Sequence, residues 1–454
     1  MSGVETEFAR KRCTADAVAA RITSGDRIFF GEFVLRPQSL DEALARRVAE
    51  LENVIVDGVC ITDVPKFIAA DPRREHFIYD DWHFSAISRD LAKRGLCSYI
   101  PLSYHQGPRI IRKYRSYDFV FVSARPMDKH GYFNFGLVNS ITSAAITKGK
   151  TVVVEVNAAL PHCLGGAQES VHISRVDYVV EGPNTAIREL HPAEPSDVER
   201  RIGLHIMPEI QDGACLQLGI GGLPNAIGSL IAQSDLRDLG IHSEMLVDSI
   251  IDLDLAGKIT GNGKRIDRFK IAYTFGMGTQ RLYDYIDGNP AFASYPVNYT
   301  NDPKLIALNN KVFAVNSAIE VDLFSQVSSE SVGPVQVSGT GGQLDFILGA
   351  FASHGGKGII GMSSTFTDKD GNVQSRIVPT LRPGSIVTLP RSIVQYVATE
   401  FGLVQLKGKS TWERAEALIG IAHPRYRDEL IRQAQTMNIW RGAHRHDGES
   451  ILAS

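Results

Sequence analysis

Short apolar runs rich in Val and Ile alternate with helix-like segments along most of this 454-residue chain. Continuous apolar runs of this kind are typical of strands buried on both faces of a sheet, and their alternation with helices predicts βαβ units. The expected strands are 27–30, 54–59, 119–122, 151–156, 177–180, 214–218, 271–275, 312–315, 359–362 and 386–389. We therefore predict an α/β fold with mostly parallel sheets.

The chain is longer than one typical domain, and its middle contains a natural boundary. Ser196 and Glu199 have the spacing of a capping box, which predicts a helix that starts there and extends to about residue 209. Pro195 ends a linker-like stretch just before this helix. We predict two tandem domains, residues 1–195 and 196–454, each built as a strand–helix series.

The composition excludes several classes of function. Lys plus Arg total 48 against 51 Asp plus Glu, with no charge block, so nothing favours nucleic acid or an anionic membrane as a partner. The start lacks the apolar stretch of a signal peptide, and no run reaches the length of a membrane span. Five scattered cysteines without a CxxC or zinc pattern indicate reduced core thiols. We expect a cytoplasmic protein without a metal site.

A single carboxylate, Glu244, interrupts the mostly apolar run 239–248. Glycine-rich turns occur on both sides of it in the sequence, at 219–222 and 338–343. An ionised carboxylate is costly to bury unless a partner or a reaction needs it, and glycine turns bring backbone N–H groups close to a bound anion or a developing oxyanion. This arrangement suggests covalent chemistry on an acyl group. An exposed loop residue, or a carboxylate paired with a buried Arg, is the structural alternative.

The upstream turn follows a predicted strand and precedes a predicted helix, as in a dinucleotide-binding fingerprint. Glu244 would then bind a ribose, because it lies 20 residues beyond Pro224. Pro224, however, stands where the third glycine of that fingerprint belongs. The start of the helix would still suit a phosphate or carboxylate, and a plain strand–helix turn is the other interpretation.

The downstream turn, 338–343, has four residues without bulky side chains directly before an apolar helix at 344–352. Such a turn presents a row of N–H donors, so it suits an oxyanion hole as well as a flexible loop. Lys357, in another glycine-rich loop, suits either a phosphate contact or a solvated position. Ser243, His242 and Asp248 contain the side chains of a catalytic triad, but sequence neighbours rarely have triad geometry.

Taken in order over some 400 residues, several segments resemble the acetyl-CoA hydrolase/transferase family, which includes the glutamate-dependent CoA-transferases. The matching segments are 122–132 ("VSxxDxHGY"), 154–161 ("EVN…P"), 212–221 (the CoA-side glycine loop), 240–245 ("GxHTEM") and 341–346 ("GGQxDF"). The resemblance implies tandem CoA-transferase domains with the active site between them, the N-terminal one on the acyl side. It also implies a homo-oligomer, and CoA as co-substrate with no tightly bound cofactor.

By the same resemblance, Glu244 is the expected nucleophile, and Gly341 and Gly342 are the expected oxyanion donors. The candidate contacts to CoA or substrate are Gly219, Ile220, Gly221, Gly222, Asn225, Gly339, Gln343 and Lys357. The implied reaction is ping-pong transfer of CoA from an acyl-CoA, such as acetyl-, butyryl- or 4-hydroxybutyryl-CoA, to a carboxylic acid.

Three alternatives stay open beside this reaction. They are hydrolysis of an acyl-CoA at the same site, an NAD-dependent oxidoreductase built on the Gly219 loop, and a non-catalytic CoA-binding protein. One segment also departs from the family: residues 31–38 replace its "GxxxEP" stretch, with Arg36 before the proline. The resemblance therefore does not imply which acyl group is preferred.

Overall fold

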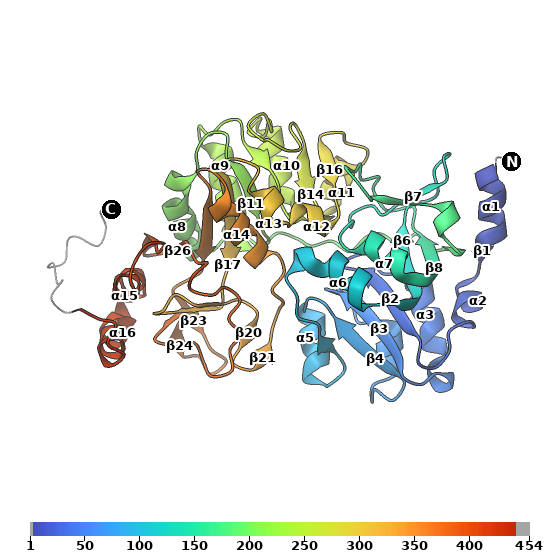
Figure 1. Ribbon diagram of the computed structural model, residues 1–454, viewed down its shortest axis with the longest axis horizontal. Coiled ribbons are helices and arrows are strands. Elements are labelled where there is room, and N and C mark those ends of the chain that lie inside the picture. Colours follow the sequence, from blue (N-terminus) through green and yellow to red (C-terminus); the bar gives the residue numbers. More distant parts are fainter. Residues whose placement is uncertain (1–2, 442–454) are drawn as a thin grey trace.

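The computed structural model describes residues 3–441 and contains two large sheets, one in each half of the chain (Figure 1). The N-terminal sheet has eight strands, all parallel to their neighbours. Their order is β1 (Arg12–Cys13), β10 (Tyr178–Glu181), β8 (Gly149–Val156), β6 (Tyr117–Ala124), β2 (Arg27–Glu32), β3 (Val54–Val59), β4 (Phe77–Asp81) and β5 (Ser98–Tyr99).

The C-terminal sheet has six strands, and only its last pair is antiparallel. Their order is β12 (Gly240–Ile241), β11 (Cys215–Leu218), β17 (Val312–Ser317), β22 (Lys357–Gly361), β26 (Tyr396–Thr399) and β27 (Gly402–Gln405). The predicted α/β fold with mostly parallel sheets is confirmed.

Helices cover the sheets and make the crossovers (Figure 1). In the N-terminal half these are α1 (Gly3–Lys11), α2 (Ala15–Ala19), α3 (Gln38–Arg46), α4 (Lys66–Ala70), α5 (Ala86–Lys93), α6 (Gly107–Tyr114) and α7 (Thr142–Lys148). In the C-terminal half they are α8 (Asp197–Ile206), α9 (Gly222–Gln233), α10 (Asp248–Leu255), α11 (Gln280–Ile286), α12 (Val297–Thr300), α13 (Pro303–Ile306), α14 (Gln343–Ala352), α15 (Thr411–Gly420) and α16 (Pro424–Thr436). None of the helices within residues 3–441 is long and apolar enough to cross a membrane.

Smaller sheets of two or three strands lie outside the two large sheets. They include β7 (Tyr132–Asn134) with β9 (Ser170–His172), β13 (Met245–Leu246) with β15 (Phe275–Gly276), β14 (Ile271–Tyr273) with β16 (Phe292–Ser294), and β20 (Ser331–Val332) with β21 (Val335–Gln336). The others are β23 (Thr365–Thr367) with β24 (Val373–Ser375), and β18 (Glu320–Asp322) between β19 (Val327–Ser328) and β25 (Ile377–Val378).

The local predictions hold with two exceptions. The predicted strand 271–275 is divided at Thr274 into β14 and β15, which belong to different small sheets. The capping box at Ser196 is present and starts α8, which ends in a 3₁₀ turn before residue 210. The predicted strand 386–389 is wrong, because only Leu389 makes an isolated bridge, to Val327. Pro390 follows this run and cannot donate to a ladder, and residues 386 and 387 are exposed. An apolar run thus lies in a loop instead of a sheet.

The two halves share one hydrophobic core that runs from the N-terminal sheet into the C-terminal one. The segment around Ser140 connects them, with bridges from Val138 to Phe275 and from Ser140 to Pro296. The predicted domain boundary near residue 195 stays a prediction; that residue lies in the irregular segment between β10 and α8. Carboxyl ends of strands from both sheets therefore come together at the junction of the halves.

Candidate active site

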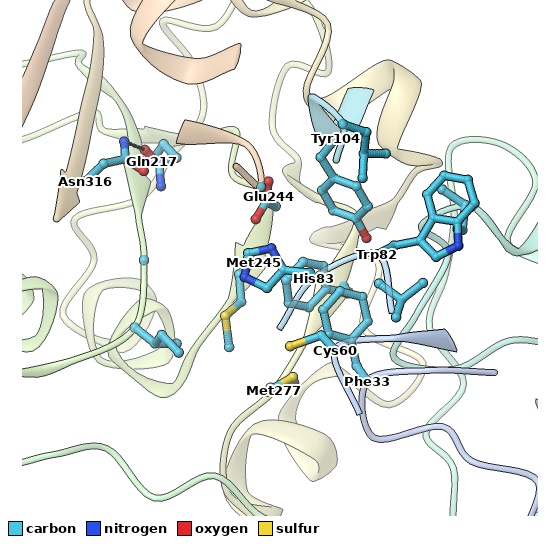
Figure 2. Close-up of a pocket in the computed structure, with 17 residues that line it drawn as sticks. Phe33, Cys60, Trp82, His83, Tyr104, Gln217, Glu244, Met245, Met277 and Asn316 are labelled. Atoms are coloured by element: carbon cyan, nitrogen blue, oxygen red, sulfur yellow. Dashed lines mark hydrogen bonds between the residues drawn. The ribbon is translucent and has the colours of Figure 1, made fainter. Parts of the chain in front are cut away.

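A cavity of about 190 Å³ lies where the two halves meet (Figure 2). Strand ends supply much of its wall, as the rule for parallel sheets predicts: Phe33 follows β2, Trp82 follows β4, and Gln217 lies near the end of β11. The N-terminal half contributes Phe33, Val59, Cys60, Trp82, His83, Leu102, Tyr104 and Ile141. The C-terminal half contributes Gln217, Gly219, Ile220, Glu244, Met245, Phe275, Met277, Asn316 and Gly341.

Glu244 is the acidic residue of this wall, and neighbouring groups hold its carboxylate. Its backbone carbonyl accepts hydrogen bonds from the N–H groups of Thr274 and Phe275, which fix the chain at this point. Asn301 Nδ2 donates to Glu244 Oε2 at 2.5 Å, and the Gly342 N–H also bonds to the carboxylate. Burial raises the pKa of Glu244 to about 7, while these two donors act in the opposite direction. Near neutral pH a substantial fraction of this carboxylate is ionised.

The two glycines before α14 occupy positions that disfavour a side chain, Gly342 because Glu244 lies close and Gly341 because of its backbone conformation. A Cβ on Gly342 would lie 1.9 Å from Glu244 Oε2 and 2.3 Å from Asn301 Nδ2. Gly341 lines the cavity and has φ of +53°, a left-handed backbone conformation that residues other than glycine rarely adopt. Its carbonyl accepts a hydrogen bond of 3.1 Å from the Tyr104 N–H of the other half. The turn thus packs directly on the carboxylate, and its role as an oxyanion hole stays a prediction.

His83 is a residue of the cavity that sequence reasoning missed. Its Nε2 lies 3.1 Å from Ser338 Oγ, and a Cβ on Gly339 would lie 2.7 Å from its Nδ1. Burial lowers its pKa to about 4, so the ring is neutral and braces the glycine turn. It belongs to no motif, and the available signal was its place just after the strand-like run that ends at Asp81.

The Gly219 turn reaches the cavity only in part. Gly219 and Ile220 line it, and Ile220 is 53% exposed. Gly221, with φ of +112°, caps α9. Gly222 begins α9 and is buried, and a Cβ there would meet the Glu199 carboxylate. Asn225 lies in the first turns of α9, and its Nδ2 donates to the Ala193 carbonyl.

The remaining candidates separate into one near residue and one distant residue. Gln343 begins α14 beside the glycine turn, and its Nε2 donates to the Ser317 carbonyl at 2.7 Å. Lys357 begins β22 and pairs with Glu209 at 2.5 Å. Its register partner is Phe313, near the start of β17, whereas the cavity lies at the carboxyl ends of these strands. Lys357 thus lies away from the cavity, and its expected phosphate contact stays a prediction.

The three triad side chains are not assembled. His242 Nε2 bonds to the Thr300 carbonyl at 2.8 Å, and Ser243 Oγ donates to the Met245 carbonyl at 2.9 Å. Asp248 accepts hydrogen bonds from Thr279 at the start of α11. His242 thereby connects the segment between β12 and β13, which carries Glu244, to the segment that carries Asn301. These contacts are structural, and no serine nucleophile results. Groups of three or more metal-ligating side chains that suit an ion are absent from residues 3–441.

Comparison with known proteins places these features in a family. Residues 2–189 match the family model of the acetyl-CoA hydrolase/transferase N-terminal domain, and residues 278–434 match that of its C-terminal domain. The chain is 47% identical to a butyryl-CoA:acetate CoA-transferase of Anaerostipes caccae, over 97% of this chain and 99% of that protein. It is 46% identical to a probable butyrate:acetyl-CoA coenzyme A-transferase of Syntrophomonas wolfei, over 97% and 98% of the two chains.

A solved structure supports the same relationship. RipA from Yersinia pestis superposes with a TM-score of 0.88 at 34% identity, covering 96% of this chain and 99% of that one. Relatives named acetyl-CoA hydrolase are more distant: that of Yarrowia lipolytica is 30% identical over 48% of this chain and 39% of its own length.

Proposed function

This chain belongs to the acetyl-CoA hydrolase/transferase family, and we propose that it moves CoA from an acyl-CoA to a carboxylic acid with Glu244 as the covalent carrier. One observation carries this proposal: the partly buried Glu244 carboxylate, which has no cationic partner within residues 3–441, faces a largely apolar cavity and contacts the Gly342 N–H. A buried carboxylate held by neutral donors is suited to nucleophilic attack. CoA acts as a co-substrate in this scheme.

The reaction proceeds in balanced steps that need no net proton transfer. Glu244 attacks the thioester carbonyl carbon, the C–S bond breaks, and an acyl-glutamyl anhydride and CoA thiolate form. The thiolate then attacks the glutamyl carbonyl, the first carboxylate leaves, and a glutamyl–CoA thioester remains. A second carboxylate reverses both steps. The chain contributes positioning and N–H donors at Gly341 and Gly342, where one well-placed donor contributes roughly 3 kcal/mol to lowering the barrier.

The lining favours small monocarboxylic acids. The cavity is bounded by apolar side chains such as Phe33, Trp82 and Phe275, and the 17 lining residues of the described chain include no Lys or Arg. A second carboxylate on the acyl chain would be buried without a partner. Short straight-chain acyl groups, as named for the butyryl-CoA:acetate relative, are therefore the proposed substrates. A homo-oligomeric state and a cytoplasmic location stay predictions.

Mass spectrometry tests the proposal. The protein is incubated with butyryl-CoA and no acceptor, and a CoA adduct on Glu244 is expected by peptide mapping. Glu244→Gln should form no adduct and transfer no CoA, whereas Glu320→Gln, a change to a buried carboxyl outside the cavity wall, should behave like the parent protein. Full transferase activity in Glu244→Gln would refute the proposal. CoA release at the same rate with and without acetate would instead indicate a hydrolase.

A further inference from the structure

A second buried carboxyl lies next to the cavity and has no part in the reaction above. Glu32 is the last residue of β2 and is 3% exposed. Its Oε1 accepts a hydrogen bond of 2.7 Å from Thr142 Oγ1, its Oε2 lies 3.5 Å from the Ile141 nitrogen, and the Ser140 hydroxyl also bonds to it. Within residues 3–441 no cationic side chain pairs with this carboxyl. A carboxyl buried without a cationic partner is costly unless the protein uses it.

Ser140 connects Glu32 to the cavity. Its hydroxyl is hydrogen-bonded to the Tyr104 hydroxyl, and both residues are buried. Tyr104 lines the cavity, and its hydroxyl points to the side occupied by Trp82 and Phe33 (Figure 2). The backbone of Ser140 is fixed by two hydrogen bonds. Its N–H donates to Thr274, and its carbonyl accepts from the Val297 N–H at 2.9 Å. A fixed chain of hydroxyl groups thus joins a buried carboxyl to the acyl side of the cavity.

The protonation state of Glu32 sets the direction of the hydrogen bonds that link Glu32, Ser140 and Tyr104. An ionised carboxylate only accepts, so Ser140 donates to it and Tyr104 donates to Ser140. The Tyr104 oxygen then offers only a lone pair to the cavity. A neutral carboxyl donates to Ser140, Ser140 donates to Tyr104, and the Tyr104 proton is free to point into the cavity. The first state repels a substrate carboxylate, and the second binds one.

We propose that Glu32 is a positioning residue for the acceptor acid: in its neutral form it orients the Tyr104 hydroxyl, through Ser140, as a hydrogen-bond donor to the acceptor carboxylate. This inference rests on the proposed transferase function. It assigns to Tyr104 the polar contact that an acid needs inside an otherwise apolar part of the wall. It also gives the two halves of the reaction different dependences on pH.

Burial raises the pKa of Glu32 to about 7, against the hydrogen bonds from Ser140, Thr142 and Ile141, so its neutral form prevails below neutral pH. The titratable groups that face Tyr104 from other elements are Glu244 and Cys60. Burial raises the pKa of the Cys60 thiol, which therefore stays protonated, and Glu244 cannot titrate while it is a thioester.

His105, next to Tyr104, bonds at 2.7 Å to Asp345, and the Asp345 carboxylate raises its pKa against the effect of desolvation. His105 is thus a second group near Tyr104 whose charge changes with pH. A variant of Glu32 itself is needed to separate the two groups.

The test measures kcat/KM for acetate against pH, with butyryl-CoA as donor. In ping-pong kinetics this parameter reports only the reaction of the glutamyl–CoA enzyme with the acceptor. In the parent protein, kcat/KM for acetate should fall by about 10- to 100-fold as the pH rises through about 7. This is the effect of losing one charge-assisted hydrogen bond. In Glu32→Gln the amide always donates, so the low-pH value should persist to pH 9. Tyr104→Phe should lower the value at pH 6 by a similar factor and remove the fall.

Glu320→Gln serves as the matched control and should keep the parent profile. If kcat/KM for acetate still falls above pH 7 in Glu32→Gln, the inference is overturned. It is also overturned if Tyr104→Phe keeps the parent kcat/KM at pH 6. The rate of thioester formation from butyryl-CoA, measured in parallel, verifies that each variant is folded. If the parent protein forms no thioester, the proposed function fails; if it forms one and its acetate profile is flat, only the role of Glu32 fails.

Discussion

Replacement of Asn301 by Ala tests how a hydrogen bond affects the ionisation of Glu244, the proposed nucleophile. Asn301 Nδ2 donates to Glu244 Oε2 at 2.5 Å and favours the ionised carboxylate, whose pKa burial raises to about 7. A hydrogen bond to a charged group contributes about 1.5–3 kcal/mol. At 1.36 kcal/mol per pKa unit, its loss should raise the pKa of Glu244 by about 1 to 2. The ionised fraction at pH 7 then falls from about one half to about 1–10%, and the rate falls by about 5- to 50-fold.

The assay is the single-turnover rate of thioester formation from butyryl-CoA between pH 5.5 and 10. The rate should rise with pH through the pKa of Glu244, and Asn301→Ala should move this rise upward by about 1–2 pH units while recovering most of the rate at high pH. Asn372→Ala, in the exposed β23–β24 turn, should match the parent curve. An unmoved midpoint with a lower plateau would refute the reasoning, because Asn301 would then act on geometry and not on ionisation.

Two further changes probe the cavity and the glycine turn beside it. Gly342→Ala places a Cβ 1.9 Å from Glu244 Oε2, so thioester formation should fall about 100-fold, while the melting temperature stays close to that of the parent because the clash is with side-chain ends; a parent rate would contradict this. Phe33 stacks on Phe275 with ring centroids 3.9 Å apart, and both line the cavity. Phe33→Ala should raise the ratio of kcat/KM for hexanoyl-CoA over butyryl-CoA by about 10-fold or more, and an equal loss for both substrates would show that Phe33 does not limit chain length.

The candidate site was predictable where its residues lie in short ordered motifs. Glu244 and Gly341 are each in such a segment, and both line the cavity. Lys357 was assigned from a glycine-rich neighbourhood alone, and its strand register places it at the opposite end of the sheet. His83 lies in no motif, so nothing local marked it. A motif carries information about a residue only when the neighbouring residues in sequence are also its neighbours in space.

Local order in this protein follows from residues close together in the sequence. Continuous apolar runs specify buried parallel strands, and the Ser196–Glu199 capping box specifies the start of α8, because these interactions span only a few residues. The contact of Asn301 with Glu244, the packing of His83 on the glycine turn and the link from Glu32 to Tyr104 join residues from separate elements. Such pairings depend on where the two sheets end and on how the two halves of the protein pack together. Burial at this junction then raises the pKa values of Glu32 and Glu244. The chemistry of the cavity is therefore a property of tertiary structure, since only folding removes water from these carboxyls and selects their partners.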